Sequence, residues 1–242
     1  MINKQRKFPG DRWPEAERVI LKEVDSRSFC MYARDFIKGR WPEAEKALLE
    51  KANPRSLSRY AIYKGGRWPE AESILLEKED PKALYEYARD VFEDRWPEAE
   101  PIILKKADPE ILYEYASGII RDRWPEAEPI LLRGSDPLYL TWYASEVIKG
   151  RWPEAEPIFL EKEDPEALYW YAYIVLGKRW PEAEKIILEK ADPKTLYDYA
   201  REVIKGRWPE AEPILFKKAN PQILDWYAAD VIQGPWPEAG IE

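Results

Sequence analysis

Pairs of glutamates recur along this chain at a spacing that acid–base chemistry could use. The string Arg-Trp-Pro-Glu-Ala-Glu occurs eight times, and each copy carries two carboxylates two residues apart, such as Glu98 and Glu100. Two neighbouring carboxylates can divide the roles of general acid and general base. A catalytic interpretation would, however, place the same site in the chain eight times. We therefore expect these glutamates to complement the positive end of a helix dipole or to pair with the motif arginine.

The other residue types supply few groups that enzyme catalysis could use. Histidine is absent, which excludes imidazole bases, Ser-His-Asp and Cys-His nucleophiles, and nearly every zinc site. Cys30 is the single cysteine, so no intrachain disulfide forms, and no base accompanies its thiol in the sequence. Neither a glycine-rich phosphate loop nor the acidic spacing of a calcium loop is present. We predict a protein that is not an enzyme, with no catalytic residue, no metal and no cofactor.

Charge and hydropathy limit the partners and the cellular compartment that we expect for this chain. The chain has 242 residues and a net charge of −8, which disfavours nucleic acid and anionic membrane surfaces as partners of the whole protein. Its apolar runs are too short to span a bilayer, and no secretory signal is evident. With a lone cysteine, these features predict a cytoplasmic protein with no membrane association.

The motif recurs with a nearly constant period. Successive motif tryptophans lie 28 residues apart except for one spacing of 27, and a worn ninth copy at residues 235–240 closes the periodic region. Such a period is the signature of a repeat architecture. The eight full copies begin at Arg12, Arg40, Arg67, Arg95, Arg123, Arg151, Arg179 and Arg207.

Each repeat predicts two short helices. In residues 96–123, Pro97 suits the first position of a helix that ends near Lys106, and Asp108 caps a second helix that runs to about Arg121. Pro101 falls inside the first helix, so we expect a loose or 3₁₀-like start there and in the three other repeats with this proline. In several repeats a glycine such as Gly150 is expected to end the second helix.

One helix pair cannot bury enough apolar surface to fold alone, so neighbouring pairs must stack. We predict an all-α fold, a right-handed α-solenoid or superhelix, with eight repeats of about 28 residues and a truncated C-terminal capping repeat. Residues 12–242 would form this single domain, preceded by a basic extension at residues 1–11. The second repeat lacks one residue after Tyr60-Ala61. We expect an early helix end there, a register rotated by ~100° and a local change in superhelical geometry.

The unit Arg-Trp-Pro-Glu-Ala-Glu, Asp-Pro, Tyr-x-Tyr-Ala and Val-Ile-Lys-Gly resembles short tryptophan-proline repeat arrays of bacteriophage and environmental viral genomes. It is more distantly similar to tetratricopeptide-type helix pairs. The resemblance covers residues 12–240 and implies the α-solenoid fold and a phage origin. It carries no residue-level function. A viral setting would imply a protein that binds or inhibits a host defence protein in the host cytoplasm.

Residues that differ between repeats are the better candidates for binding. On a helical wheel the second helix leaves one stripe outside its apolar face, at positions 15, 19, 22 and 26 counted from the motif tryptophan. Three tryptophans outside the motif all occupy position 19, and we predict a contact surface around them. This aromatic stripe comprises Leu138, Trp142, Trp170, Tyr173 and Trp226. A basic stripe in the first two repeats comprises Arg27, Arg34, Lys38, Arg55 and Arg59.

Three uses of these stripes stay open. A protein partner is one, and a second copy of the chain or packing within the superhelix is another. A nucleic-acid-binding or nucleic-acid-mimicking repeat protein is the third, since helical repeats can stack single-stranded bases on aromatic side chains. The acidic net charge disfavours nucleic acid, so we expect a protein partner, with a homo-oligomer as the alternative.

Overall fold

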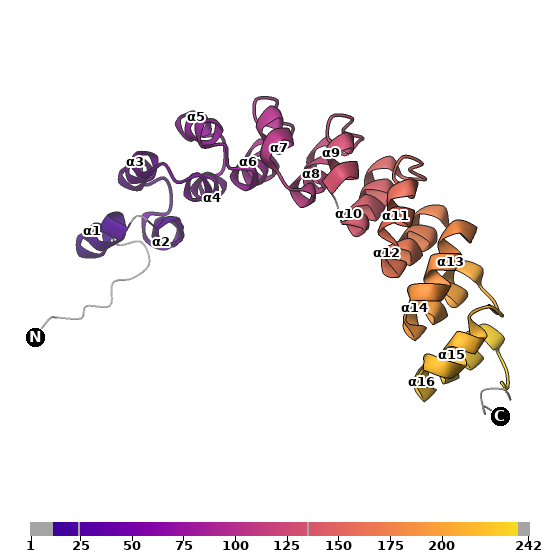
Figure 1. Ribbon diagram of the computed structural model, residues 1–242. Coiled ribbons are helices and arrows are strands. Elements are labelled where there is room, and N and C mark those ends of the chain that lie inside the picture. Colours follow the sequence, from indigo (N-terminus) through magenta and orange to yellow (C-terminus); the bar gives the residue numbers. More distant parts are fainter. Residues whose placement is uncertain (1–11, 24, 135, 237–242) are drawn as a thin grey trace, which may run out of the picture. The chain divides into compact units, whose positions relative to one another are not determined.

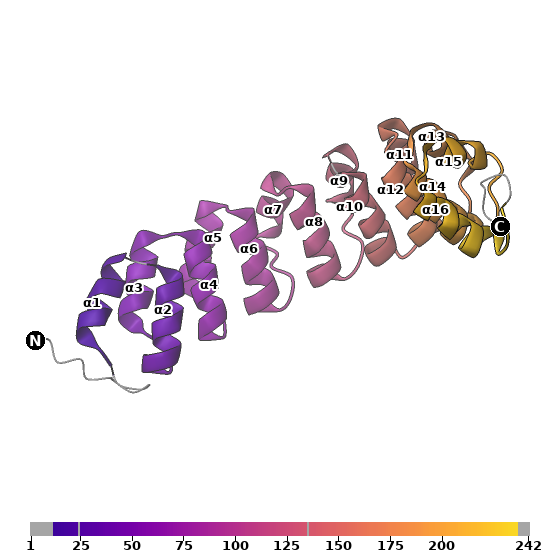
Figure 2. The same ribbon diagram turned by 90° about the horizontal axis from the view of Figure 1, so that it is seen from below.

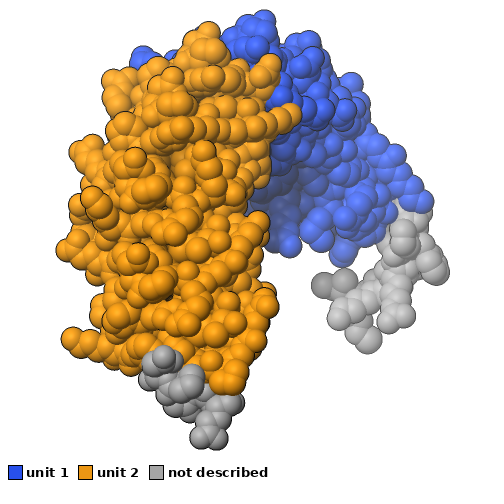
Figure 3. Space-filling model, turned by 90° about the vertical axis from the view of Figure 1, so that its right-hand side faces the viewer, with its two compact units in different colours: residues 1–121 blue, residues 122–242 orange. Residues whose placement is uncertain are grey.

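The computed structural model describes residues 12–23, 25–134 and 136–236, and within them the helices come in consecutive pairs. The chain divides into two compact units, Met1–Arg121 and Asp122–Glu242 (Figure 3), and each holds four of the predicted pairs. The predicted all-α, α-solenoid repeat fold is confirmed. The basic extension at residues 1–11 and positions 237–240 of the worn ninth motif lie outside the described residues.

Unit 1 contains repeats one to four. Their first helices are α1 (Pro14–Glu23), α3 (Pro42–Lys51), α5 (Pro69–Lys78) and α7 (Glu100–Lys106). Their second helices are α2 (Ser26–Tyr32) continuing as the π-helix η1 (Ala33–Ile37), α4 (Pro54–Lys64), α6 (Pro81–Tyr87) with η2 (Ala88–Phe92), and α8 (Pro109–Tyr115) with η3 (Ala116–Ile120). First helices pack beside first helices and second beside second, which makes two layers (Figures 1 and 2).

Unit 2 repeats this arrangement with repeats five to eight. Its first helices are α9 (Glu128–Gly134), α11 (Glu156–Lys162), α13 (Pro181–Lys190) and α15 (Glu212–Lys218). Its second helices are α10 (Pro137–Trp142) with η4 (Tyr143–Ile148), α12 (Pro165–Trp170) with η5 (Tyr171–Leu176), α14 (Pro193–Asp198) with η6 (Tyr199–Ile204), and α16 (Pro221–Trp226) with η7 (Tyr227–Ile232). The second helices follow one another side by side from α10 to α16.

The predicted helix starts are confirmed. Every second helix begins at an Asp or Asn whose side chain accepts a hydrogen bond from a backbone N–H of the first turn. The extra proline of the first helix also acts as expected. Where it is present, as at Pro101, the α-helix starts only at the preceding glutamate, and the Ala99 N–H reaches back three residues to the Trp96 carbonyl. Where lysine replaces it, as in α13, the helix starts three residues earlier in the motif.

A π-turn ends seven of the eight second helices. In five of these repeats the carbonyl of the alanine in the Tyr-Ala pair accepts from an N–H five residues on; the Lys149 N–H, for example, donates to the Ala144 carbonyl. A π-turn holds one residue more than an α-helical turn. In the second repeat, where one residue is missing, α4 stays α-helical to its end, and Gly65 donates to Ala61 four residues back at 3.0 Å.

The short second repeat therefore behaves differently from the prediction. Its helix does end early, as expected. The rotated register is wrong, because the missing residue is the one that the other repeats place in the π-turn. The buried side chains on either side keep their places: Tyr60 and Ala61 are 0% exposed and the next motif tryptophan, Trp68, is 2% exposed.

The ends of the second helices also correct the expected role of glycine. The residue in the left-handed conformation is the one before Gly39, Gly150 or Gly206, and in these three repeats it is a lysine. Six side-chain-bearing residues there have φ between 55° and 62°: Lys38, Glu93, Arg121, Lys149, Lys205 and Gln233. Only Gly65 and Gly177 place a glycine at this position.

Replacing Lys149 with glycine is expected to stabilise the protein by about 1 kcal/mol, because an L-residue in the left-handed region is strained by roughly 1–2 kcal/mol. The matched control is Gly177→Lys, which should destabilise by a similar amount, since an added Cβ at Gly177 meets no neighbouring atom and brings only the backbone penalty. Urea titration followed by circular dichroism measures both. Changes of the same sign would contradict the explanation.

Candidate functional site

The recurring polar residues of each repeat form one cluster. The motif arginine binds the second motif glutamate through two parallel hydrogen bonds, which are 2.8 Å and 2.7 Å between Arg179 and Glu184. The Tyr199 hydroxyl donates to that carboxylate at 3.1 Å and accepts from the backbone N–H of Trp180 at 3.0 Å. The two helices of a repeat are thereby joined through one tyrosine.

The same arginine–glutamate pair is present in all eight repeats. The predicted pairing of motif glutamate with motif arginine is confirmed for the second glutamate of each copy. The first glutamate, as at Glu98 and Glu182, is exposed. Because the second glutamate is held by an arginine and a tyrosine in repeat after repeat, its geometry serves the fold.

The recurring tyrosine also joins neighbouring repeats. The Tyr199 ring lies 5.0 Å, centroid to centroid, from the ring of Trp208 in the next repeat, and the same pairing occurs down both units. Trp13 precedes the first such tyrosine and is 46% exposed, whereas the later motif tryptophans are at most 5% exposed. The sequence predictions assigned no role to the hydroxyl of this tyrosine. The sequence does contain a signal for this hydroxyl, because no repeat has phenylalanine in place of the tyrosine.

Alkaline pH should unfold the protein through these tyrosines. Burial raises the pKa of Tyr60, Tyr171 and Tyr227 to about 12, against about 10 in an unfolded chain. A raised folded pKa means that the stability is complete below pH ~10 and falls as the pH rises through the folded pKa. We expect ellipticity at 222 nm to collapse above pH ~10, together with the rise of tyrosinate absorbance at 295 nm. Full titration of all tyrosines with the helices intact would contradict this.

The aromatic stripe lies on the second helices of unit 2. Trp142, Tyr173 and Trp226 are 38%, 40% and 38% exposed, and Leu138 and Trp170 are half-buried. These rings also pack on tyrosines. Trp226 lies 5.9 Å from Tyr197 of the preceding repeat, and Trp170 lies 4.9 Å from Tyr169. The phase argument correctly placed the rings outside the core, and it did not anticipate that each leans on a neighbouring ring.

The basic stripe lies on the second helices of the first two repeats, and all five cations are exposed. Two of them are already paired with carboxylates. Arg34 binds Asp35 at 2.7 Å, and Arg55 binds Asp80 at 3.3 Å. These pairs reduce the positive charge that the stripe offers to a phosphate backbone.

Cys30 is half-buried in α2, with its Sγ 4.0 Å from the carbonyl oxygen of Arg59. Burial raises the pKa of this thiol to about 11. The thiolate, which is the reactive form, is therefore scarce at neutral pH. These surroundings fit a structural role for Cys30.

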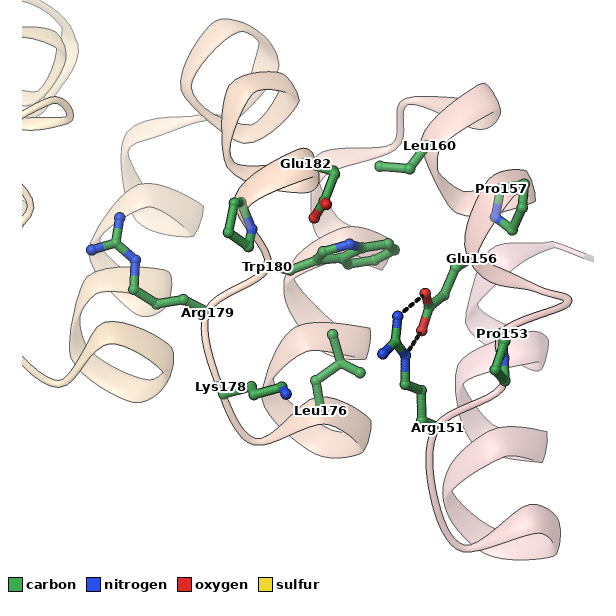
Figure 4. Close-up of a pocket in the computed structure, with 11 residues that line it drawn as sticks. Arg151, Pro153, Glu156, Pro157, Leu160, Leu176, Lys178, Arg179, Trp180 and Glu182 are labelled. Carbon is green, nitrogen blue, oxygen red and sulfur yellow. Dashed lines mark hydrogen bonds and ion pairs between the residues drawn. The ribbon is translucent and has the colours of Figure 1, made fainter.

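A groove of about 480 Å³ opens between the first helices of repeats six and seven in unit 2 (Figure 4). Leu160 of α11 and Leu176 of η5 line it, and the Trp180 ring forms part of its floor. Arg151, Lys178 and Glu182 stand around its mouth. The sequence prediction contained no site on this layer of helices.

Comparison with family models, with curated proteins and with solved structures gives no match. Among the described helices, none has the length and apolar character needed to cross a membrane. Within the part of the chain that the structure describes, no cluster of acidic or cysteine side chains is arranged to hold a metal ion.

Proposed function

We propose that this protein is a non-enzymatic repeat scaffold that binds another protein through the aromatic stripe of unit 2. The observation that carries this proposal is the contrast between two sets of tryptophans. From Trp41 on, the motif tryptophans are nearly inaccessible, whereas Trp142 and Trp226 keep 38% of their surface in water. Exposed aromatic rings on surface helices are typical of protein-binding hot spots.

The stripe has the mixed character of a protein interface. Hydroxyl and charged groups flank its rings: Tyr197 contacts both Asp230 and Arg201 across repeats seven and eight. Interfaces combine an apolar aromatic centre with a polar rim in this way. The rings rest on tyrosines and are thus pre-oriented, which lowers the entropic cost of binding.

The basic stripe favours nucleic acid less, because two of its five cations are paired. Self-association through the aromatic stripe is the competing use of the same surface. The resemblance to viral repeat arrays extends our proposal to a phage-encoded inhibitor of a host defence protein, acting in the host cytoplasm.

The test replaces Trp142, Trp170 and Trp226 together with serine and compares affinity purifications from the native host with those of the unaltered protein. The matched control carries alanine at Glu86, Glu114 and Asp198, which occupy the same repeat position. We expect the tryptophan variant alone to lose its partner. The variant should stay folded, with a loss of roughly 1 kcal/mol per ring, because the rings already contact water.

Light scattering separates the two uses of the stripe. A monomer before and after substitution, with loss of a bound protein, supports the proposal. A dimer that the tryptophan variant dissociates would assign the stripe to self-association. Retention of the partner by the tryptophan variant would refute the proposed surface.

A further inference from the structure

The first repeat exposes an apolar face that every later repeat buries. Trp13 is 46% exposed and Val19 is 57% exposed. Ala16 and Ile20 of the same face are partly exposed. The seven residues that correspond to Ala16 are all 0% exposed, and the seven that correspond to Ile20 are at most 1% exposed. We call Trp13, Ala16, Val19 and Ile20 the N-terminal end face.

Later repeats show what covers this face. The first helix of a repeat packs on the second helix of the repeat before it, as α5 packs on α4 and α13 packs on α12. Its motif tryptophan contacts the recurring tyrosine of that repeat, and the ring centroids of Tyr171 and Trp180 are 5.3 Å apart. No tyrosine of an earlier repeat precedes Trp13 in the described part of the chain. The surface that fits the N-terminal end face is therefore the far side of another repeat of this kind.

Repeat eight presents such a far side at the other end of the array. Leu224 of α16 is partly exposed, whereas its seven counterparts in the earlier repeats, such as Leu196, are 0% exposed. Phe216 of α15 is 36% exposed. Tyr227 is the recurring tyrosine of this repeat. We call Phe216, Leu224 and Tyr227 the C-terminal end face.

The worn ninth motif covers part of the C-terminal end face. The Trp236 ring lies 4.9 Å from Tyr227 and 4.5 Å from Phe216, centroid to centroid, and it is 1% exposed. Trp236 thus takes the position that the motif tryptophan of a following repeat would take. The motif arginine and the second glutamate are paired in all eight full repeats, but Pro235 and Gly240 stand at their positions in the ninth motif. The ninth motif therefore supplies the ring contact without the arginine–glutamate pair.

We infer that the two end faces are complementary between copies of this chain, and that Trp236 is a built-in cap that keeps the copies apart. When Trp236 leaves Tyr227, Trp13 of a second copy packs in its place, and the N-terminal end face is buried as it is at every boundary between repeats. Both halves of that boundary are present in one chain, so their shapes and chemistry already match.

The cap prevails over a second copy because it belongs to the same chain. A tethered group has an effective concentration of the order of millimolar, which exceeds a micromolar concentration of free protein. The contact joins two different surfaces, so copies that lack the cap continue to add head to tail. The end faces are separate from the aromatic stripe, and the inference does not depend on the function proposed for that stripe.

Sedimentation velocity on the full chain tests the cap. The unaltered protein should be monomeric at ~100 µM, since the tethered cap excludes a second copy. W236S should form oligomers with a weight-average mass at least about twice that of the monomer, while W236F keeps a ring and should stay monomeric. W13S/W236S should be monomeric again. The matched variant W142S/W236S lacks a similarly exposed tryptophan of the aromatic stripe and should still form oligomers.

A mixing experiment tests the direction of the contact. The unaltered protein offers only its N-terminal end face, and W13S/W236S offers only its C-terminal end face. An equimolar mixture of the two should therefore give a 1:1 heterodimer and nothing larger. A mixture of the unaltered protein with W13S should stay monomeric, because both C-terminal end faces are capped.

Circular dichroism and thermal melting show whether each variant is folded. Trp236 follows the last described helix, η7, so its replacement should leave the helices in place. Four results would overturn the inference: unfolding of W236S, a monomeric W236S at ~100 µM, which is below the effective concentration of the cap, oligomers that persist in W13S/W236S, or no heterodimer in the mixture. Loss of oligomers in W142S/W236S would instead assign self-association to the aromatic stripe.

Discussion

Replacing Tyr199 with alanine is expected to lower the free energy of unfolding by about 4–8 kcal/mol. The fully buried ring is lost from beside Trp208, and such truncations cost roughly 3–5 kcal/mol. The hydroxyl is lost as well, so the Glu184 carboxylate loses one hydrogen-bond donor and the Trp180 N–H loses its acceptor. A buried polar group that loses its partner costs a further 1–3 kcal/mol or so.

Two variants give this prediction its controls. Tyr199→Phe keeps the ring and removes the hydroxyl, so it should cost only about 1–3 kcal/mol. Tyr173→Ala removes a tyrosine that is 40% exposed and lies two residues after the recurring tyrosine of its repeat. This change should cost less than about 1 kcal/mol. Urea denaturation of the three variants measures these differences. Equal losses for Tyr199→Ala and Tyr173→Ala would show that the recurring tyrosine does not join the repeats.

Deleting a single residue should cost much more stability in the second repeat than in the fifth. Removing Ser145 takes one residue from η4, so the end of that helix can become α-helical, as α4 already is. We expect a loss of less than about 2 kcal/mol. Removing Ile62 shortens α4, which has no π-turn residue to give up. The following residues then rotate by ~100°, and we expect a loss of more than about 4 kcal/mol as the packing around Trp68 is broken.

Denaturant titration again provides the measurement, and the circular dichroism of the folded baseline shows whether helix content is kept. A tolerated deletion at Ile62 and a disruptive one at Ser145 would refute the role of the π-turn. It would mean that the 27-residue spacing is accommodated in the Gly65-Gly66 turn instead.

The helix pairs were predictable because local chemistry fixes their starts. Asp108 caps the second helix through its own side chain, and Pro101 removes an N–H that the first helix needs. The π-turn was not predictable from one repeat, since helical periodicity does not reveal where an extra residue is stored. Its consequence, a left-handed Lys149 before Gly150, ran against the usual preference for glycine.

The candidate sites, too, were predictable from the sequence only in part. Trp142 and Trp226 stood out because they interrupt a pattern, and the structure leaves them partly exposed. Their contacts with tyrosines depend on how second helices pack, which the sequence of one helix does not show. The groove over Trp180 was missed because Leu160 and Leu176 conform to the apolar pattern.

The central claim is that recurring residues make the fold and that non-recurring tryptophans make the binding surface. Site-specific photocrosslinking tests it most directly, with a benzophenone amino acid placed at Trp170 or, as the control at the same repeat position in unit 1, at Glu114. We predict an adduct with one other protein from the first position and none from the second. Adducts only within the chain or between two copies of it, or equal labelling from both positions, would contradict the account.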